Sequence, residues 1–145
     1  MADGEDGLHI AVIGASGSAG SDIVQSLERS SIPVATWTLF GAPARRRPSL
    51  ELDKRVISVR GMPELDELVA AVEDADLVIF ACPPDVTRAL ATAVVDAGPA
   101  VLDVGGALLG QGAFGVGLAG GMDEERFRES RVLSTPAAPG VLLAA

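Results

Sequence analysis

The sequence is poor in several residues that catalytic and metal sites use. Its 145 residues include no tyrosine, one cysteine and one histidine, and aromatic residues make up 3% of the chain. The lack of tyrosine excludes a Tyr-Lys proton-transfer pair, and one cysteine with one histidine cannot build a zinc site. A single cysteine also excludes an intrachain disulfide. This fits a reducing compartment, and we expect a cytoplasmic protein.

Positive charge is also scarce. The chain has 11 Lys and Arg against 20 Asp and Glu, which gives a net charge of −9. A surface for duplex nucleic acid needs a basic stripe, so we expect no nucleic-acid partner. No apolar run reaches the roughly 20 residues that cross a bilayer. Residues 1–7 lack the basic and then apolar order of a signal peptide, and we expect no membrane association.

The hydrophobic pattern alternates between short apolar runs, typical of buried strands, and stretches with the spacing of amphipathic helices. The predicted strands cover residues 8–13, 34–40, 77–81, 100–104 and 131–134, with a short strand or hairpin over residues 50–59. The predicted helices cover residues 17–30, 63–75, 83–97 and 123–130. This alternation predicts an α/β fold, a Rossmann-like doubly wound parallel sheet in a single domain. We divide the chain into an acidic tail (1–7), a dinucleotide-binding domain (8–134) and an apolar C-terminal segment (135–145).

A glycine-rich turn joins the first predicted strand to the first predicted helix. It reads Gly14-Ala15-Ser16-Gly17-Ser18-Ala19-Gly20, with the spacing G-x-x-G-x-x-G. Glycines let the backbone approach a pyrophosphate, and the helix N-terminus offers N–H groups and a positive dipole end. All seven residues are therefore candidate dinucleotide ligands. The alternative is a tight turn whose small residues serve packing only.

The residues after the second predicted strand favour NADP over NAD. NAD sites usually carry Asp or Glu there to bind the ribose 2′-hydroxyl, but this strand ends Leu39-Phe40-Gly41. Three arginines, Arg45, Arg46 and Arg47, follow within a few residues. Guanidinium groups suit a 2′-phosphate, and we name Arg45 and Arg46 as candidate ligands. A solvated loop is the alternative.

Cys82 and Pro83 follow the strand predicted over residues 77–81, at the edge where open α/β sheets bind ligands. We expect both to contact the cofactor. A nucleophilic role for Cys82 is conceivable because helix N-termini lower thiol pKa values, but a small packed residue is the favoured interpretation. His9 lies inside the first strand, as a packed or edge residue. Asp103 ends its strand without an evident partner, so we assign it no role.

Four segments, in order, resemble the N-terminal NADP-binding domain of aspartate-semialdehyde dehydrogenases. They are AVIGASGSAG (11–20), the Leu39-Phe40 pair, DLVIFA (76–81) and VLDVGG (101–106). N-acetylglutamyl-phosphate reductases have a similar turn and are a near alternative. The resemblance implies an oxidoreductase family of amino-acid biosynthesis that uses a catalytic cysteine in an Asn-Pro-Asn-Cys type motif.

The departures from that family concern catalysis. The matching stretch is STPAAPG (134–140), in which Ala138 occupies the cysteine position, and Val104-Gly105-Gly106 replaces the family's Asn-Ser-Ser. The second domain, which carries the family's catalytic histidine and substrate arginines, is not in the sequence. The chain therefore resembles a fragment or a degenerate relative, and we assign no catalytic residue and no metal.

Three interpretations compete with an inactive NADP-binding domain. The first is a piece of an active semialdehyde dehydrogenase, which Ala138 argues against. The second is a non-enzymatic interaction module, which the apolar residues 141–145 favour. We accordingly expect association with a second copy or another chain. The third is an atypical short-chain reductase relative, which the lack of tyrosine argues against.

Overall fold

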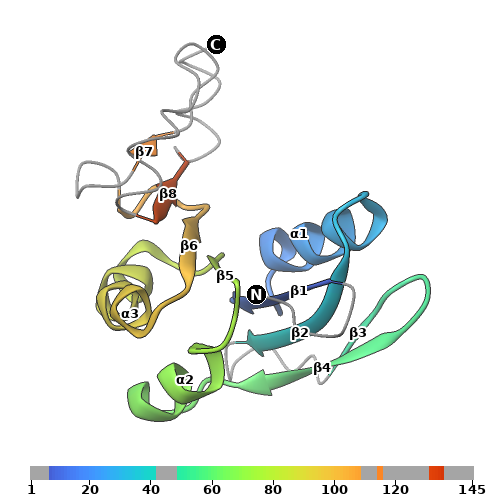
Figure 1. The fold of residues 1–145 in the computed structure, drawn as a ribbon, viewed down its shortest axis with the longest axis horizontal. Helices are drawn as coiled ribbons and strands as arrows, with labels where there is room; N and C mark the ends of the chain where they lie inside the picture. Colours follow the sequence, from blue (N-terminus) through green and yellow to red (C-terminus); the bar gives the residue numbers. More distant parts are fainter. Residues whose placement is uncertain (1–6, 42–48, 109–113, 116–130, 136–145) are drawn as a thin grey trace.

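The computed structural model describes residues 7–41, 49–108, 114–115 and 131–135. The strands are β1 (Leu8–Ile13), β2 (Val34–Gly41), β3 (Ser49–Glu51), β4 (Val56–Gly61), β5 (Leu77–Phe80), β6 (Ala100–Asp103), β7 (Phe114–Gly115) and β8 (Val132–Ser134). The helices are α1 (Ser18–Arg29), α2 (Leu65–Val72) and α3 (Pro84–Ala97). The strands form one sheet in the order β3-β4-β2-β1-β5-β6-β8-β7 (Figure 1). The predicted Rossmann-like α/β fold is confirmed.

Strand β1 lies in the middle of the sheet, and the chain winds outward from it in both directions. It pairs in parallel with β2 on one side and with β5 on the other. Ile13 lies opposite both Phe40 and Phe80, so the three strands end at one level. Such a reversal of strand order opens a crevice at the carboxyl ends of the strands, where α/β proteins bind ligands.

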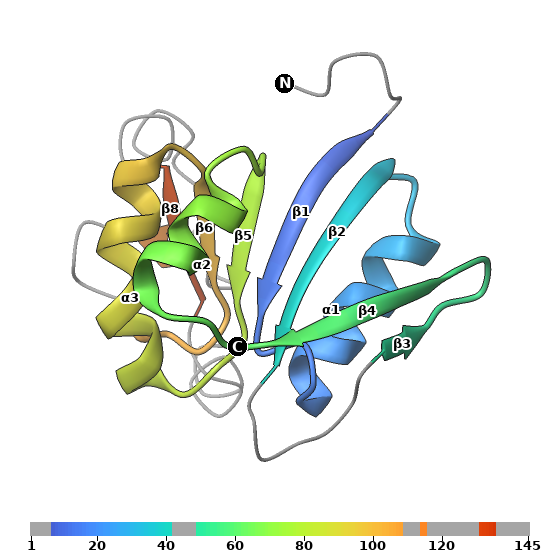
Figure 2. The ribbon, with the colours of Figure 1, turned by 90° about the horizontal axis from the view of Figure 1, so that it is seen from below.

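Both faces of the sheet are covered, as the alternation of side chains along β1 requires. Ile10 and Val12 pack toward α1, in a cluster with Val24. Ala11 and Ile13 pack on the opposite face, in a cluster with residues of α2 and α3. Figure 2 shows α2 and α3 together on one side of the sheet and α1 on the other. The core therefore has two layers separated by the sheet.

Most of the predicted elements agree with the structure to within a residue or two. The segment predicted as a short strand or hairpin is the antiparallel pair β3–β4. The helix predicted from Pro63 is shorter than expected. Glu64 is still extended, so α2 begins at Leu65, and the bond from the Ala75 N–H to the Val72 carbonyl lies just beyond its end. The helix predicted over residues 123–130 lies outside the described residues.

No helix in the described part of the chain is long and apolar enough to cross a membrane.

Candidate functional site

The glycine turn begins at the end of β1 and is held by backbone contacts on two sides. Gly14 has a φ of 101°, and a Cβ there would collide with the carbonyl of Ala81, the first residue after β5. The N–H groups of Gly14 and Ala15 both donate to the Phe40 carbonyl, at 2.8 and 2.9 Å. The turn is therefore anchored to both neighbours of β1, which fixes where α1 begins.

Gly20 and Gly17 differ in how much space their surroundings leave for a side chain. A Cβ on Gly20 would collide with the Gly14 carbonyl oxygen and lie 2.9 Å from Ala15 Cα, so glycine lets the helix pack on the turn. A Cβ on Gly17 would meet only the Gly14 oxygen, at an ordinary 3.5 Å. Packing does not demand a glycine at position 17. The glycine at position 17 is instead explained by close approach of a ligand to the backbone.

The N-terminus of α1 is open to an anion. Gly17 is its N-cap and supplies no side-chain cap, and no acidic residue lies in the first turn. The bond from the Ser21 N–H to the Gly17 carbonyl is the first of the helix, so the preceding N–H groups have no intrahelical acceptor. By contrast, the first turn of α2 holds Asp66 and Glu67 and that of α3 holds Asp85. The positive end of the α1 dipole is thus left for a ligand.

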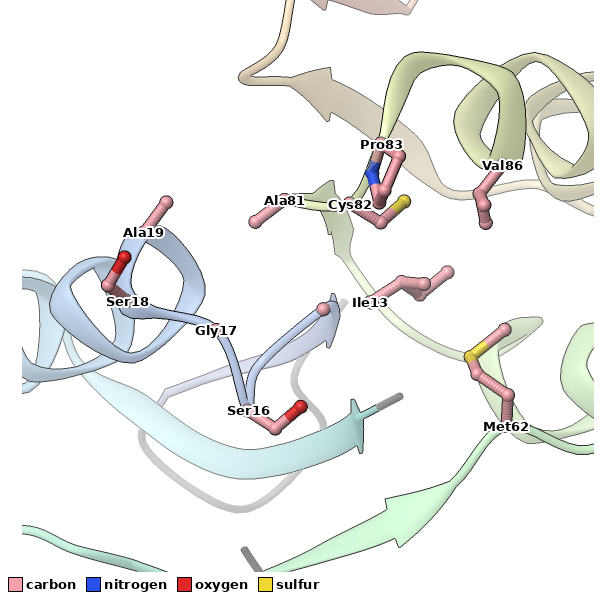
Figure 3. Close-up of a pocket in the computed structure, with 11 residues that line it drawn as sticks. Ile13, Ser16, Gly17, Ser18, Ala19, Met62, Ala81, Cys82, Pro83 and Val86 are labelled. Carbon is pink, nitrogen blue, oxygen red and sulfur yellow. The ribbon is translucent and has the colours of Figure 1, made fainter. Parts of the chain in front are cut away.

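The turn borders a cavity of about 500 Å³ at the crevice between β1 and β5. Figure 3 shows the glycine turn on one side and Cys82, Pro83 and Val86 on the other, with Met62 at the rim. The cavity is lined by Ile13, Gly14, Ser16, Gly17, Ser18, Ala19, Met62, Ala81, Cys82, Pro83 and Val86. A largely apolar pocket of this size with a few polar backbone groups is typical of cofactor sites.

The structure brings together most of the predicted site residues. Cys82 and Pro83 share the cavity with residues of the glycine turn, from which they are more than 60 positions distant in the sequence. Ala15 and Gly20 do not line the cavity and are buried behind it. The arginines at positions 45–47 and Ala138 lie outside the described residues.

Cys82 has the surroundings of a protonated thiol. It is half-buried, and its Sγ lies 3.2 Å from Thr87 Oγ1. Burial raises the pKa of the Cys82 thiol, an effect that outweighs the hydrogen bond with Thr87. Proximity to the start of α3 thus does not make this cysteine a thiolate, and the geometry favours the packed residue over the nucleophile.

His9 lies too far along β1 to act as a base for Cys82. Its Nε2 is 2.8 Å from Thr38 Oγ1, and its backbone N–H donates to the Asp76 carboxylate at 2.8 Å. His9 precedes Ile13 by four residues, or about 13 Å at the rise of a strand. Within the part of the chain that the structure describes, no group of three or more His, Cys, Asp and Glu residues could hold a metal ion.

Asp103 has a role that the sequence analysis missed. Its carboxylate is fully buried and accepts hydrogen bonds from Ser134 Oγ at 2.7 Å and from the Leu108 and Gly105 N–H groups at 2.8 and 3.1 Å. The loop after β6 is thereby tied to β8. The glycine pair after Asp103 was a weak sign of such a turn, but Ser134 becomes a neighbour only because β6 pairs with β8. Asp103 is thus a structural residue beside the site.

Position 41, the last residue of β2, has no room for a side chain. A Cβ on Gly41 would lie 2.6 Å from Ser16 Oγ and 2.8 Å from Ser16 Cβ. Ser16 belongs to the glycine turn, so the turn itself occupies the space that a side chain at position 41 would need. An acid that binds the ribose therefore cannot stand at position 41.

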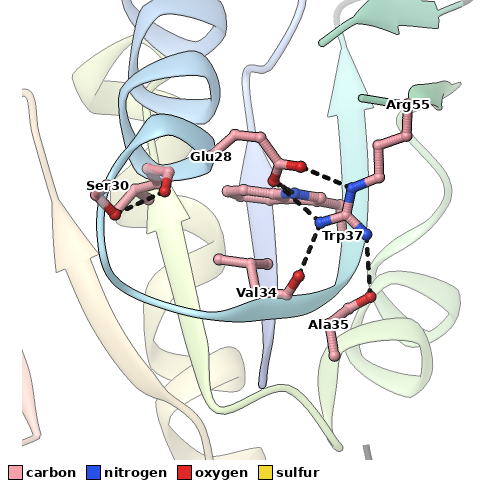
Figure 4. A network of polar contacts seen from close by, with 7 residues as sticks. Glu28, Ser30, Val34, Ala35, Trp37 and Arg55 are labelled. Carbon is pink, nitrogen blue, oxygen red and sulfur yellow. Dashed lines mark hydrogen bonds and ion pairs between the residues drawn. The ribbon is translucent and has the colours of Figure 1, made fainter. Parts of the chain in front are cut away.

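A polar network at the far end of α1 holds the helix on the sheet. Arg55, which precedes β4, donates to both carboxylate oxygens of Glu28 at 2.9 and 3.0 Å and to the Val34 carbonyl at 2.8 Å (Figure 4). The Trp37 indole N–H also donates to Glu28, at 3.0 Å. The bonds from Arg55 hold the pKa of Glu28 below its ordinary value. With both ends fixed, the N-terminus of α1 keeps its position at the cavity.

The fold, the glycine turn and the cavity together define a Rossmann-like dinucleotide-binding domain. Residues 9–119 match the family described as "Semialdehyde dehydrogenase, NAD binding domain". The match covers more than half of the chain, and the chain belongs to this family. It is accordingly a nicotinamide-dinucleotide-binding domain, and the resemblance to aspartate-semialdehyde dehydrogenases is confirmed.

Three relatives illustrate this membership. The USG-1 protein homolog of Azotobacter vinelandii is 33% identical over 101 residues, which are 70% of this chain and 29% of that protein. A probable aspartate-semialdehyde dehydrogenase from Pseudomonas aeruginosa superposes with a TM-score of 0.76 at 26% identity, over 96% of this chain and 42% of its own. Aspartate semialdehyde dehydrogenase with NADP from Candida albicans gives a TM-score of 0.57 at 16% identity, over 85% of this chain and 36% of its own. The chain thus spans less than half the length of these relatives.

Proposed function

We propose that this chain binds NADP(H) on the glycine turn and does not itself catalyse semialdehyde oxidation. The observation that carries the proposal is the open N-terminus of α1, which faces a cavity of about 500 Å³ at the crevice of the sheet. Backbone N–H groups of Gly17, Ser18 and Ala19 would hold the pyrophosphate. Cys82 and Pro83 would flank the cofactor on the opposite wall. The chemistry that a bound nicotinamide would supply is hydride transfer to or from a substrate carbon.

The preference for the phosphorylated cofactor rests on charge and on space. Position 41 cannot hold an acid without displacing Ser16, so the last residue of β2 does not supply the usual carboxylate contact to a ribose 2′-hydroxyl. Arg45, Arg46 and Arg47 follow after three intervening residues and can pair with a 2′-phosphate. The Candida relative is described with NADP. Replacing the three arginines with alanine should weaken NADP binding and leave NAD binding nearly unchanged.

The absence of catalysis rests on the missing nucleophile. Phosphorylating oxidation of an aldehyde needs a thiolate that attacks the carbonyl carbon. Ala138 offers a methyl group at the family's cysteine position. Cys82 is the sole thiol, its pKa is raised by burial, and His9 is distant from it. The chain's own residues therefore bind and orient a dinucleotide but do not supply the attacking group.

The test is a calorimetric titration of the wild type and of Gly17→Asp with NADPH and NADH. Aspartate is a good N-cap, and a Cβ at position 17 meets only one atom, at 3.5 Å, so the variant should fold at least as well as the wild type. Its carboxylate would cap the N–H groups and repel a phosphate, so both cofactors should lose affinity. Gly17→Ser is the matched control for charge, because it also adds a Cβ and a cap but no negative charge, and it should lose less affinity than Gly17→Asp. Unchanged binding by Gly17→Asp would contradict the proposal.

NADPH fluorescence is the better optical signal for this titration. Trp37 is buried on the α1 face of the sheet, in the cluster with Ile10 and Val12, and it is not among the residues that line the cavity. Its emission need not change when the cavity is occupied.

A further inference from the structure

We propose that Arg60 is a further cofactor-specificity residue, which donates hydrogen bonds to the 2′-phosphate of NADP. The proposal deepens the proposed function and rests on it. It concerns one strand, β4, whose carboxyl end lies beside that of β2.

Arg60 is in register with the residues that carry the glycine turn. It lies opposite Phe40 in β2, and Phe40 lies opposite Ile13 in β1. At the spacing of adjacent strands, Arg60 is about 10 Å from Ile13 across the sheet. The carbonyl of Phe40 accepts the N–H groups of Gly14 and Ala15. Only β2 therefore separates Arg60 in β4 from β1 and the glycine turn that would hold the pyrophosphate.

The side chain of Arg60 lies on the face of the sheet that lines the cavity. Its guanidinium carbon is 5.8 Å from the centroid of the Phe40 ring, and Phe40 packs in the same cluster as Ile13. Met62, two residues further along, forms part of the cavity lining (Figure 3). Arg60 does not itself line the cavity, but it lies beside the end of β2, where dinucleotide-binding domains contact the ribose of the adenosine half.

Arg60 forms no ion pair with any carboxylate that the structure describes. Arg29 pairs with Asp53 and Arg55 pairs with Glu28, whereas Arg60 is exposed and unpaired among these residues. The cation–π contact with Phe40 leaves the guanidinium N–H groups available to a further acceptor. Guanidinium groups pair bidentately with phosphate oxygens, so these N–H groups can accept a 2′-phosphate.

The contact between Arg60 and Phe40 joins two paired strands, because Arg60 lies opposite Phe40 across β4 and β2. Phe40 is only 2% exposed, so the ring beneath the guanidinium is fixed in the core.

The experiment measures the Kd of NADP⁺ and NAD⁺ for the wild type, Arg60→Met and Arg60→Lys, with adenosine 2′-phosphate as a fragment probe. Methionine keeps an unbranched side chain over Phe40 and removes the charge. Arg29→Met is the matched control, because Arg29 is an exposed arginine at the opposite end of α1. Thermal melting by circular dichroism confirms that each variant folds.

We expect Arg60→Met to bind NADP⁺ and adenosine 2′-phosphate about 10- to 100-fold more weakly, as for the loss of a charge-assisted bond. NAD⁺ binding should change less than about twofold, Arg60→Lys should be intermediate for NADP⁺, and Arg29→Met should resemble the wild type. Equal loss for NADP⁺ and NAD⁺ would mean that Arg60 stacks on adenine and would overturn the proposal, as would no loss for either. A wild type that binds neither cofactor would instead refute the proposed function, together with this inference.

Discussion

Replacing Gly20 with alanine tests whether the close packing of α1 on the glycine turn is needed for stability and for cofactor binding. Alanine is favoured over glycine in a helix by about 1 kcal/mol. Here, however, the added Cβ would collide with the Gly14 carbonyl oxygen and lie 2.8 Å from Gly14 C and 2.9 Å from Ala15 Cα. All three are backbone atoms that cannot rotate away. Overpacking of this kind costs about 3 kcal/mol at the upper end of its usual range, which leaves a net loss of about 2 kcal/mol.

A loss of about 2 kcal/mol should lower the Tm by about 4–8 °C in a chain of this size. NADPH affinity should fall as well, because the turn at Gly14 must shift to admit the methyl group. The matched control is Gly61→Ala at the end of β4, where a Cβ would meet no atom within 4 Å. That variant should gain about 0.5–1 kcal/mol, because alanine loses less conformational entropy than glycine on folding. The measurements are thermal melting by circular dichroism and NADPH titration. A Gly20→Ala variant that melts at or above the wild-type temperature would refute the reasoning.

Three further predictions concern a charge pair, catalysis and association. Because the hydrogen bond from Arg55 lowers the pKa of Glu28, their pair adds stability above the unfolded pKa of about 4.3 and loses it as the pH falls through the folded value. Glu28→Gln should therefore be less stable than the wild type in urea at pH 7, and this difference should shrink as the pH is lowered. We expect no NADPH formation from aspartate semialdehyde, phosphate and NADP⁺ by the wild type or by Ala138→Cys, and wild-type turnover that Cys82→Ser abolishes would contradict this. We also expect concentration-dependent association in light scattering that weakens when the apolar residues 141–145 are removed; a monomer at every concentration would argue against it.

The local elements and the turn could be predicted from the sequence because their signals are short-range. The run LHIAVI, three glycines at a spacing of three, and the helical period after them lie within 23 consecutive residues. The structure has the same elements there, β1 and α1, with Gly17 as the N-cap between them. Backbone hydrogen bonding and periodicity determine such elements within a few residues, so a sequence pattern suffices.

Contacts between distant segments were decided only by the tertiary structure. Asp103 meets Ser134 because β6 pairs with β8, and Arg60 lies over Phe40 because β4 pairs with β2. The exclusion of a side chain at Gly41 likewise depends on how closely Ser16 of the turn approaches the end of β2. None of these pairs is marked by spacing along the chain, because strand order and register select which side chains become neighbours. The sequence by itself therefore determined the family, the fold and the place of the glycine turn. The pairing of the strands decided which charged residues lie near that turn and where a side chain has no room.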